Sequence, residues 1–361
     1  ATSNHGVCFD YGILAWANDN QIVIDGQNSS TGGGVTVIRN QPTVESEIYS
    51  SSATVPAISI SGSSQSLFGV ITGFSLATNN LLTIQATGAG GVSVSGTTTT
   101  PSATWPEVGF SSTDLLSAGP ITVNTSTTNT NGGFYTAKYG SSAVGTTENI
   151  FGYCDTTTCP KSLVTSSSAN ITITSNVIST NSGASNYLTF NTAGALVLQP
   201  LATTGFKNLN LMNHASSLVE SADMTGLTIG KDQSTNTDSV TLYHPISIAG
   251  SVSVYGGSIT TNSINTTATS GTGILLKATG NIEVSAGASS SSKTTIAVTG
   301  TNSTAPITFL ANSDAASTGA ILINNYVDIS SVAGAIKMGG AAASTDTTPT
   351  TFAITGTGAT A

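Results

Sequence analysis

Three cysteines and three histidines are the residues of this chain best suited to covalent cross-linking or metal binding. Cys154 and Cys159 bracket a four-residue polar loop that is followed by Pro160. A disulfide between them would pin a loop that has little core of its own. The alternative is a metal site that adds His5 and Cys8, but this needs residues about 150 positions apart to meet. We predict the Cys154–Cys159 disulfide, no metal site, and Cys8 as a buried thiol or an intermolecular partner.

Acid–base and phosphate chemistry have few residues to use in this chain. Only 7% of the residues are charged, and 8 Lys and Arg against 17 Asp and Glu give a formal net charge of −9. Arg39 is the only arginine, and the closest acidic pair, Glu45 and Glu47, is expected to form solvent-facing charges on an edge strand. Enzymes that cleave polysaccharides need grouped carboxylates. We therefore predict that the chain is not an enzyme and holds no cofactor, and its negative charge disfavours nucleic acid.

A glycine run, Gly32–Gly34, lies between the expected strands Gln21–Asp25 and Gly34–Ile38. A phosphate-binding loop would have to lead into a helix, whose N-terminus binds the phosphate. Because a strand follows instead, we predict a hairpin turn at this run. His244, which precedes Pro245, is expected to be an ordinary turn histidine.

Short strands that alternate apolar and small polar residues must position whatever site the chain has. From about residue 165 onward, pairs of apolar residues separated by one residue form two expected ladders, as strands with one buried face would. The first ladder contains Leu227/Ile229, Val252/Val254, Ile274/Leu276, Ile296/Val298 and Ile321/Ile323. The second contains Ile259, Ile282/Val284, Ile307/Phe309 and Val327/Ile329. Successive members lie 20 to 25 residues apart, which is typical of one coil of a parallel β-helix, with insertions such as 286–293 at the corners.

Three segments carry a resemblance to a known family: Met224–Gly230, Ser239–Thr261 and Gly273–Val284. They resemble the strand repeats of large bacterial surface exoproteins, the filamentous-haemagglutinin-like or beta-strand-repeat adhesins. The similarity covers about residues 165–340. It implies a right-handed parallel β-helix that is secreted, lies at the bacterial cell surface, and does adhesive or structural work.

The predicted fold class is all-β, because β-branched residues dominate and no apolar stripe has helical spacing. Residues 166–340 are expected to form the β-solenoid, and residues 1–165 a less regular β-rich cap or first set of coils. Residues 341–361 form a tail with a C-terminal extension strand. No stretch is apolar enough to span a membrane. Ala1 follows either a removed signal peptide or an earlier part of a longer chain.

The tail contains one alternating strand, which we predict to be an assembly strand. Its residues are Thr351, Phe352, Ala353, Ile354 and Thr355. Since no charged residue follows Asp346, nothing there discourages pairing with a neighbouring copy. The alternative is that this strand folds back as a cap on its own solenoid.

The sequence as a whole indicates a secreted structural subunit of a bacterial surface fibre or sheath, located outside the cell or at its surface. We expect such a subunit to self-associate into a homopolymer through β-strand contacts. The alternatives are a monomeric adhesin rod, with surface glycans as partners, and a β-helix that binds or cleaves carbohydrate. An exposed aromatic row would favour carbohydrate, and its candidates are Tyr187, Tyr243, Tyr255 and Tyr326.

The cysteine prediction can be tested by mass mapping of the protein without reductant. We expect Cys154 and Cys159 to be joined within one peptide. Two free thiols at these positions, or stoichiometric bound zinc, would contradict the pairing.

Overall fold

The structure is a computed structural model of the 361-residue chain. It describes residues 5–9, 13–38, 46–74, 82–99, 106–110, 113–126, 133–136, 147–152, 163–180, 186–210, 222–316, 319–350 and 354–356. Every regular element in these residues is a β-strand, and the named strands pair in parallel. No helix in these ranges is long and apolar enough to cross a membrane. The chain divides into two compact units: unit 1 is residues 1–197 and 208–220, and unit 2 is residues 198–207 and 221–361.

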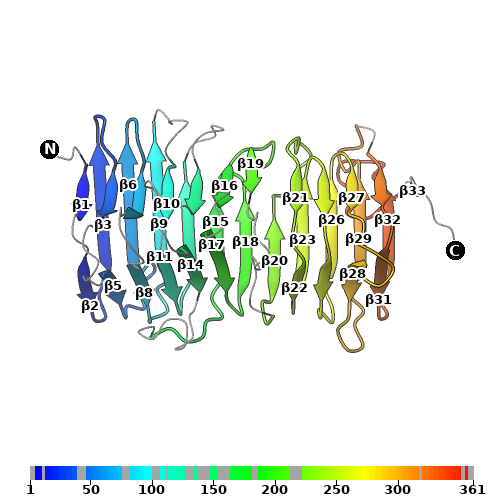
Figure 1. The fold of residues 1–361 in the computed structure, drawn as a ribbon, viewed down its shortest axis with the longest axis horizontal. Helices are drawn as coiled ribbons and strands as arrows, with labels where there is room; N and C mark the ends of the chain where they lie inside the picture. The colour runs from blue at the N-terminus through cyan, green and yellow to red at the C-terminus, as the bar shows by residue number, and fades with distance from the viewer. Residues whose placement is uncertain are drawn as a thin grey trace. The chain divides into compact units, whose positions relative to one another are not determined.

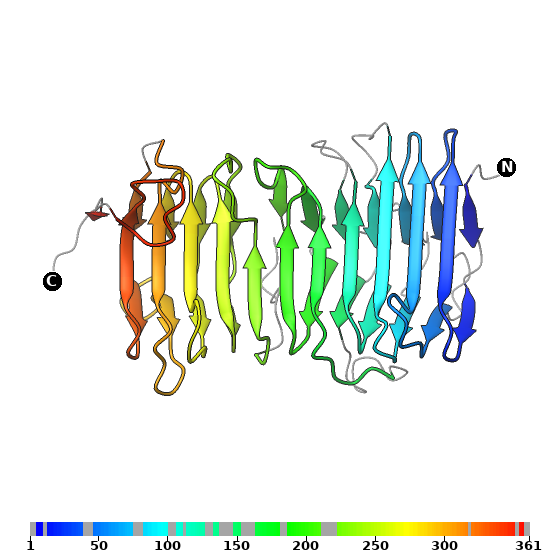
Figure 2. The same ribbon diagram turned by 180° about the vertical axis from the view of Figure 1, so that it is seen from behind.

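Unit 1 contains three stacks of parallel strands, which the chain visits in turn (Figure 1). Stack 1 contains β1 (Val7–Phe9), β4 (Val35–Ile38), β7 (Val70–Phe74), β10 (Val108–Phe110), β13 (Phe134–Thr136), β16 (Val177–Thr180) and β19 (Asn208–Asn210). Stack 2 contains β2 (Leu14–Ala17), β5 (Ser46–Ser50), β8 (Leu82–Ala86), β11 (Thr113–Ser117), β14 (Thr147–Gly152) and β17 (Asn186–Asn191). Stack 3 contains β3 (Ile22–Asn28), β6 (Ile58–Ser64), β9 (Val92–Thr98), β12 (Ile121–Thr125), β15 (Ile171–Thr174) and β18 (Ala195–Gln199). In Figure 2 the strands of stack 3 lie side by side in chain order, from blue to green.

Unit 2 is also built from three stacks of parallel strands. Stack 4 contains β21 (Val240–Leu242), β24 (Ile259–Thr261), β27 (Ile282–Val284), β30 (Ile321–Ile323) and β33 (Ile354–Gly356). Stack 5 contains β22 (Ile246–Ile248), β25 (Ile264–Thr266), β28 (Thr294–Val298) and β31 (Val327–Ser331). Stack 6 contains β20 (Gly226–Ile229), β23 (Ser251–Gly256), β26 (Ile274–Ala278), β29 (Ile307–Ala311) and β32 (Ile336–Gly340).

From β4 to β19 and from β23 to β33, each strand pairs with a strand from the coil before it, and this confirms the predicted β-solenoid. Ile22 of β3 pairs with Ile58 of β6, which pairs with Val92 of β9. The pairing of β6 with β9 extends over all seven residues of both strands. Residues before 165 therefore already form stacked coils.

Alternation along each strand decides which side chains enter the core. In β6, Ile58 and Ile60 are buried, and Ser59 and Ser61, which alternate with them, face outward and are half-buried. Burial of an isoleucine side chain contributes about 1.5–3 kcal/mol. The outward Ser and Thr residues supply uncharged hydroxyl groups for hydrogen bonds, and the β-branched Thr favours a strand. This pattern is why so weakly charged a chain can form many short strands.

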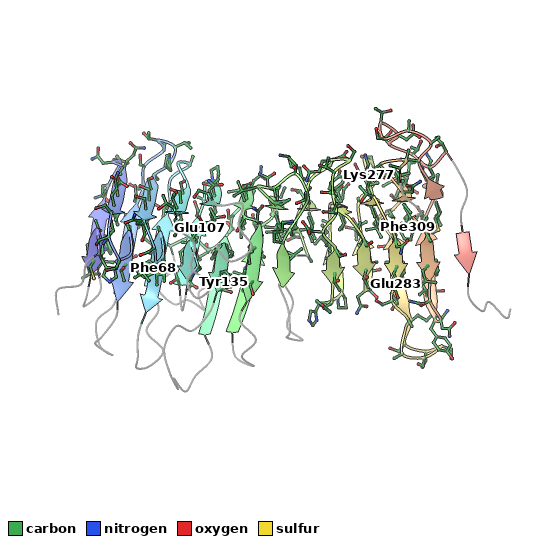
Figure 3. All side chains as sticks on the ribbon, turned by 90° about the horizontal axis from the view of Figure 1, so that it is seen from above. Phe68, Glu107, Tyr135, Lys277, Glu283 and Phe309 are labelled. Carbon is green, nitrogen blue, oxygen red and sulfur yellow. The ribbon has the colours of Figure 1, made fainter. Side chains whose placement is uncertain are left out.

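Large inward side chains from successive coils contact one another. In unit 1, Phe110, Phe134 and Phe151 are fully buried, and their ring centroids lie 5.7 to 5.9 Å apart. Phe190 continues this cluster at 5.7 Å from Phe151, with the two rings nearly perpendicular. In unit 2, Figure 3 shows Phe309 inside the coil and Glu283 on an outer face, whereas Lys277 is buried.

A ladder of glycines marks where stack 3 approaches the start of stack 1. Gly26, Gly62 and Gly96 are paired in register in β3, β6 and β9. A Cβ at Gly62 would lie 2.0 Å from the carbonyl oxygen of Gly69, and one at Gly96 would lie 2.2 Å from that of Glu107. Because these contacts are with backbone, only glycine fits at these positions.

Buried hydroxyls recur at the corners between strands. Ser64 donates to the carbonyl oxygen of Gly32 at 2.6 Å, and its Oγ accepts the N–H of Ser66 at 3.2 Å. Ser303 repeats the arrangement, donating to Ala268 O at 2.6 Å and accepting from Ala305 N at 3.1 Å. Each hydroxyl thus joins its own turn to the corner one coil earlier.

The predicted hairpin at Gly32–Gly34 is wrong. β3 and β4, the two strands that flank this run, belong to different stacks and pair with β6 and β7 respectively. The run is a corner at which the chain passes from stack 3 to stack 1. A hairpin and a corner both need glycine between two strands, so the local sequence does not distinguish them.

The two predicted ladders are correct only in their first members. Val252 and Ile274 pair as expected, but Ile274 then pairs with Ile307 and not with Ile296. Ile259 and Ile282 also pair as expected, and Ile282 then pairs with Ile321. Ile296 lies in stack 5 between Ile264 and Ile329. The residues inserted at 286–293 lengthen one coil, and the later strands therefore change ladder.

The aromatic cluster gives a direct test of the core of unit 1. We expect Phe134→Ala to lower the free energy of unfolding by about 3–5 kcal/mol, because it leaves a cavity against two neighbouring rings. Val55→Ala, at a side chain that is 69% exposed, is the control and should change it by less than about 0.5 kcal/mol. Urea denaturation followed by circular dichroism measures both. Equal effects of the two changes would contradict the packing described.

Candidate functional site

Three strands in the first coil of unit 1 each have one edge with no described partner. β1, β2 and β3 each pair with one strand, which is β4, β5 and β6 respectively. Among the strands that the structure describes, none pairs with their other edge. That edge presents backbone N–H and C=O groups to which a further parallel strand can bind.

Exposed apolar side chains accompany these edges. Leu14 and Trp16 face outward on β2 and are 68% and 64% exposed, and Val23 on β3 is 65% exposed. The ring of Trp16 lies 5.1 Å from that of Tyr49 on the next coil. The first coil therefore has an apolar surface beside its unpaired backbone.

The last coil of unit 2 has comparable edges at β31 and β32. Ile336 pairs with the fully buried Ile307, yet it is 45% exposed because no described strand covers it. Val332 and Tyr326 of the same coil are also exposed. Six of the nine large apolar side chains that are exposed in the described chain lie in its first or last coil. This distribution identifies the two terminal coils as the candidate functional site.

Few charges protect these edges. The edge strands of the first and last coils, β1, β2, β3, β31, β32 and β33, contain only Asp25, Asp328 and Lys337 as charged residues. Asp328 is paired with Lys293 at 3.0 Å within unit 2. Asp25 in the first coil accepts a hydrogen bond from Ser61 at 2.7 Å, and Lys337 in the last coil is exposed. The remaining charges of the two ends are therefore opposite in sign.

The predicted assembly strand is only partly described. Ile354 and Thr355 lie in β33, which pairs with β30 of the same chain through Ile321↔Ile354 and Leu322↔Thr355. Thr351, Phe352 and Ala353 lie outside the described residues. The pairing with a neighbouring copy stays a prediction.

A hydrogen-bonded turn leads into β33. The Asp346 carboxylate accepts the N–H groups of Ala342 and Ala343 at 2.9 and 3.0 Å and the hydroxyl of Thr350 at 3.0 Å. The backbone closes the turn through Thr350 N to Gly340 O at 2.9 Å. The bond from Ala343, then those from Ala342 and Thr350, lower the pKa of Asp346 below its ordinary value.

Cys8 and His5 are not part of a metal-binding cluster among the described residues. Cys154 and Cys159 lie outside the described residues, so their disulfide stays a prediction. Cys8 is half-buried on β1. His5 Nδ1 accepts the N–H of Gly33 at 2.9 Å, and this bond gives the histidine a structural role. No group of three His, Cys, Asp or Glu residues in the described ranges could hold a metal ion.

Of the two neighbouring carboxylates Glu45 and Glu47, the structure describes only Glu47. Glu45 lies outside the described residues, and Glu47 on β5 accepts a hydrogen bond from the Gln85 side chain of the next coil. Gln85 in turn accepts the N–H of Leu163 at 3.1 Å. Glu47 thus helps to hold the segment at Leu163 over stack 2.

A buried carboxylate that the sequence did not indicate lies at Glu107. It is fully buried, and its Oε1 accepts the N–H of Thr98 at 3.2 Å and the hydroxyl of Ser126 at 3.1 Å. Thr98 is the last residue of β9 and Ser126 follows β12, so the carboxylate joins the ends of strands in successive coils. No local pattern around Glu107 distinguishes it from a surface glutamate.

The tyrosines do not form one described row. Tyr243 and Tyr326 lie at corners between stacks 4 and 5, whereas Tyr255 lies on β23 of stack 6. Asn262 and Ser263 occupy the same corner one coil after Tyr243. The side chain of Tyr187 lies outside the described residues. His244, beside Tyr243, is in the turn before β22, as expected.

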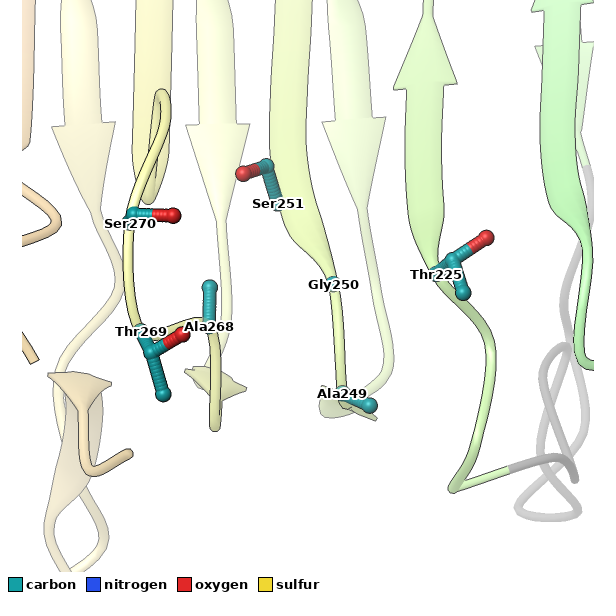
Figure 4. Close-up of a pocket in the computed structure, with 7 residues that line it drawn as sticks. All are labelled: Thr225, Ala249, Gly250, Ser251, Ala268, Thr269 and Ser270. Carbon is teal, nitrogen blue, oxygen red and sulfur yellow. The ribbon is translucent and has the colours of Figure 1, made fainter. Parts of the chain in front are cut away.

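One shallow depression of about 240 Å³ lies at a corner of unit 2 (Figure 4). Its lining residues are small and neutral: Thr225, Ala249, Gly250, Ser251, Ala268, Thr269 and Ser270. None of them can donate or accept a proton near neutral pH, so acid–base catalysis has no group there.

The Asp346 turn predicts a measurable titration. Because the folded pKa lies below the ordinary value, the stabilisation is present above that ordinary value and is lost as pH falls through the folded pKa. Thr350→Val removes one donor, and we expect it to raise the pKa of Asp346, measured by carboxyl ¹³C NMR. Thr348→Val, in the same turn, leaves the three donors in place and is the control. An unchanged pKa in the Thr350→Val protein would contradict the described hydrogen bond.

Comparisons of the chain with models of protein families, with curated proteins and with solved structures gave no match. The open strand edges of the first and last coils, with their exposed apolar side chains, are the features that support a function.

Proposed function

We propose that this chain is an extracellular structural subunit of a bacterial surface fibre or sheath. Its copies join head to tail through β-strand contacts, and its work is mechanical rather than catalytic. The observation that carries the proposal is the concentration of exposed apolar side chains beside unpaired strands in both terminal coils.

Backbone geometry supports strand contacts between copies. All named strands pair in parallel, so the unpaired edges of the first and last coils present complementary rows of N–H and C=O groups. Proteins usually protect such edges with lysine, proline or a covering segment. Here the edge strands contain only three charged residues, which favours close approach of two copies.

The first-coil surface of one copy would meet the last-coil surface of another, and because these two surfaces differ, the assembly is head to tail. One consists of β1, β2 and β3, and the other of strands of the last coil. A contact between two different surfaces leaves one of each free after every addition. If the rotation between copies does not close a ring, the product is a filament.

Location outside the cell and the bacterial surface are proposed from the sequence. The strand repeats resemble those of surface exoproteins, and the low charge with a candidate disulfide at Cys154 and Cys159 suits a secreted protein.

The assembly proposal predicts that a charge at a terminal coil prevents association. We expect Ile336→Lys to raise the concentration at which filaments form at least tenfold, because it places an ammonium group on an apolar contact. Val55→Lys is the control, since Val55 is exposed to a greater extent but lies outside the terminal coils. Sedimentation velocity and negative-stain microscopy measure both, and circular dichroism checks the fold.

Two results would contradict the proposal. One is a full-length protein that stays monomeric at high concentration. The other is an equal effect of Ile336→Lys and Val55→Lys, which would mean that the terminal coil has no special part in association.

A further inference from the structure

We infer that the edge formed by β30, β31 and β32 receives β1, β2 and β3 of a second copy, and that β33 occupies the place of the incoming β1 in the isolated chain. The inference rests on the proposed function, because it specifies the junction between copies. The strand order, a corner motif shared by the two units, and the exposure of the last coil all lead to this arrangement.

Strand order leaves two places open on the last coil. Within unit 2, strands from β20 onward pair with the strand three places later, so β29 pairs with β32 and β30 pairs with β33. In the described chain no strand takes the next two places, on β31 and β32. The first coil that the structure describes has three strands in consecutive order, and in a second copy they would together continue all three stacks from β30, β31 and β32.

A corner motif shows which strands of the two copies correspond. Before stack 3, Gly91 has φ 78°, and a Cβ there would lie 2.1 Å from the carbonyl oxygen of Pro120. Before stack 6, Gly273 has φ 63°, and a Cβ would lie 2.2 Å from the carbonyl oxygen of Pro306. The N–H after each glycine donates to that oxygen, at 2.8 and 3.0 Å.

The shared motif makes stack 3 of one copy equivalent to stack 6 of another. From these stacks the chain passes to stack 1 and stack 4 respectively, and then to stack 2 and stack 5. β3 of the incoming copy is therefore placed on β32, β2 on β31, and β1 on β30. Since β33 already pairs with β30, it must leave before β1 can bind.

The exposure of inward side chains in the last coil indicates that β33 covers stack 4 and leaves stacks 5 and 6 uncovered. Ile321 on β30, beneath β33, is fully buried. Ile336 on β32 is 45% exposed, and Val327 and Ile329 on β31 are partly exposed. The tail thus protects the place of β1 and leaves the places of β2 and β3 open.

The exchange favours the incoming copy once it has docked. β33 and β1 each offer three residues to β30, so replacing one by the other keeps the length of that pairing. β2 and β3 add strands of four and seven residues on β31 and β32. Strand addition to an exposed edge is a recurring mode of protein recognition.

Alignment of the first residues of β3 and β32 gives the register. Ile22 would pair with Ile336, and Val23 with Lys337. The aliphatic stem of Lys337 would then cover Val23, while its ammonium group reaches the diagonal position at Asp25.

Deletion of residues 341–361 distinguishes two roles for β33. One is a cap on its own chain, and the other is the strand donated to a neighbouring copy that the sequence predicts. If β33 is a cap, filaments of the deleted protein form at a several-fold lower concentration than those of the full chain. Loss of assembly in a deleted protein that keeps its circular dichroism spectrum would overturn the cap and support strand donation.

A reversible lock tests the exchange in the full chain. Leu322→Cys with Thr355→Cys joins β33 to β30 at a paired position, so the oxidised protein should not assemble and the reduced protein should. Thr260→Cys with Glu283→Cys joins an inner pair of stack 4 and is the control, which should assemble in both states. Equal assembly of the locked protein in both states would overturn the exchange.

The register is tested by cross-linking two separately purified variants. Mixed Val23→Cys and Lys337→Cys proteins should form a disulfide between these positions, identified by mass mapping with the native cysteines in place. Ser59→Cys, which pairs with Val23 one coil further in, replaces Val23→Cys in the control and should not cross-link to Lys337→Cys. Filaments that form without the Val23–Lys337 cross-link would overturn the inferred junction and leave the proposed function standing. A full chain that never associates would overturn both.

Discussion

Parallel hydrogen bonding between successive coils is the interaction on which the rest of this structure depends. Because paired strands of successive coils lie in register, inward residues meet inward residues and outward residues meet outward ones. Strands of three to seven residues are then long enough, since each needs only one or two buried side chains. No described strand completes this pairing on the outer side of the first and last coils, and these are the edges at which we propose that another copy binds.

Corner chemistry lets the coils differ in length without losing this register. Hydroxyls such as those of Ser64 and Ser303 bond to the corner one coil earlier, and glycines such as Gly62 allow backbone to approach backbone. Residues inserted between corners, as at 286–293, leave the pairing of the strands on either side intact. Stability is thus local to neighbouring coils, as in other solenoids.

The sequence predicted the solenoid because alternation is a property of each strand, and the pairs at Val252 and Ile274 lie as expected. It did not predict the later ladders, because register is kept by backbone pairing and not by a constant coil length. It did not distinguish the corner at Gly32–Gly34 from a hairpin, since both need glycine between two strands. The open edges were also missed: Trp16 and Ile336 alternate like residues of inner strands, and their exposure depends on which strands lie beside them.

The buried corner hydroxyls have a consequence for the conditions that the folded chain can tolerate. Bonds such as that from Ser303 to Ala268 join neutral groups, which do not ionise between acid and alkaline pH and are not screened by dissolved ions. The ion pairs Lys207–Asp238, Lys277–Asp232 and Lys293–Asp328 involve at least one partly exposed partner each, so salt weakens only these outer contacts. A coil held in this way keeps its cohesion in brine and in fresh water alike, and this durability suits the proposed role outside the cell.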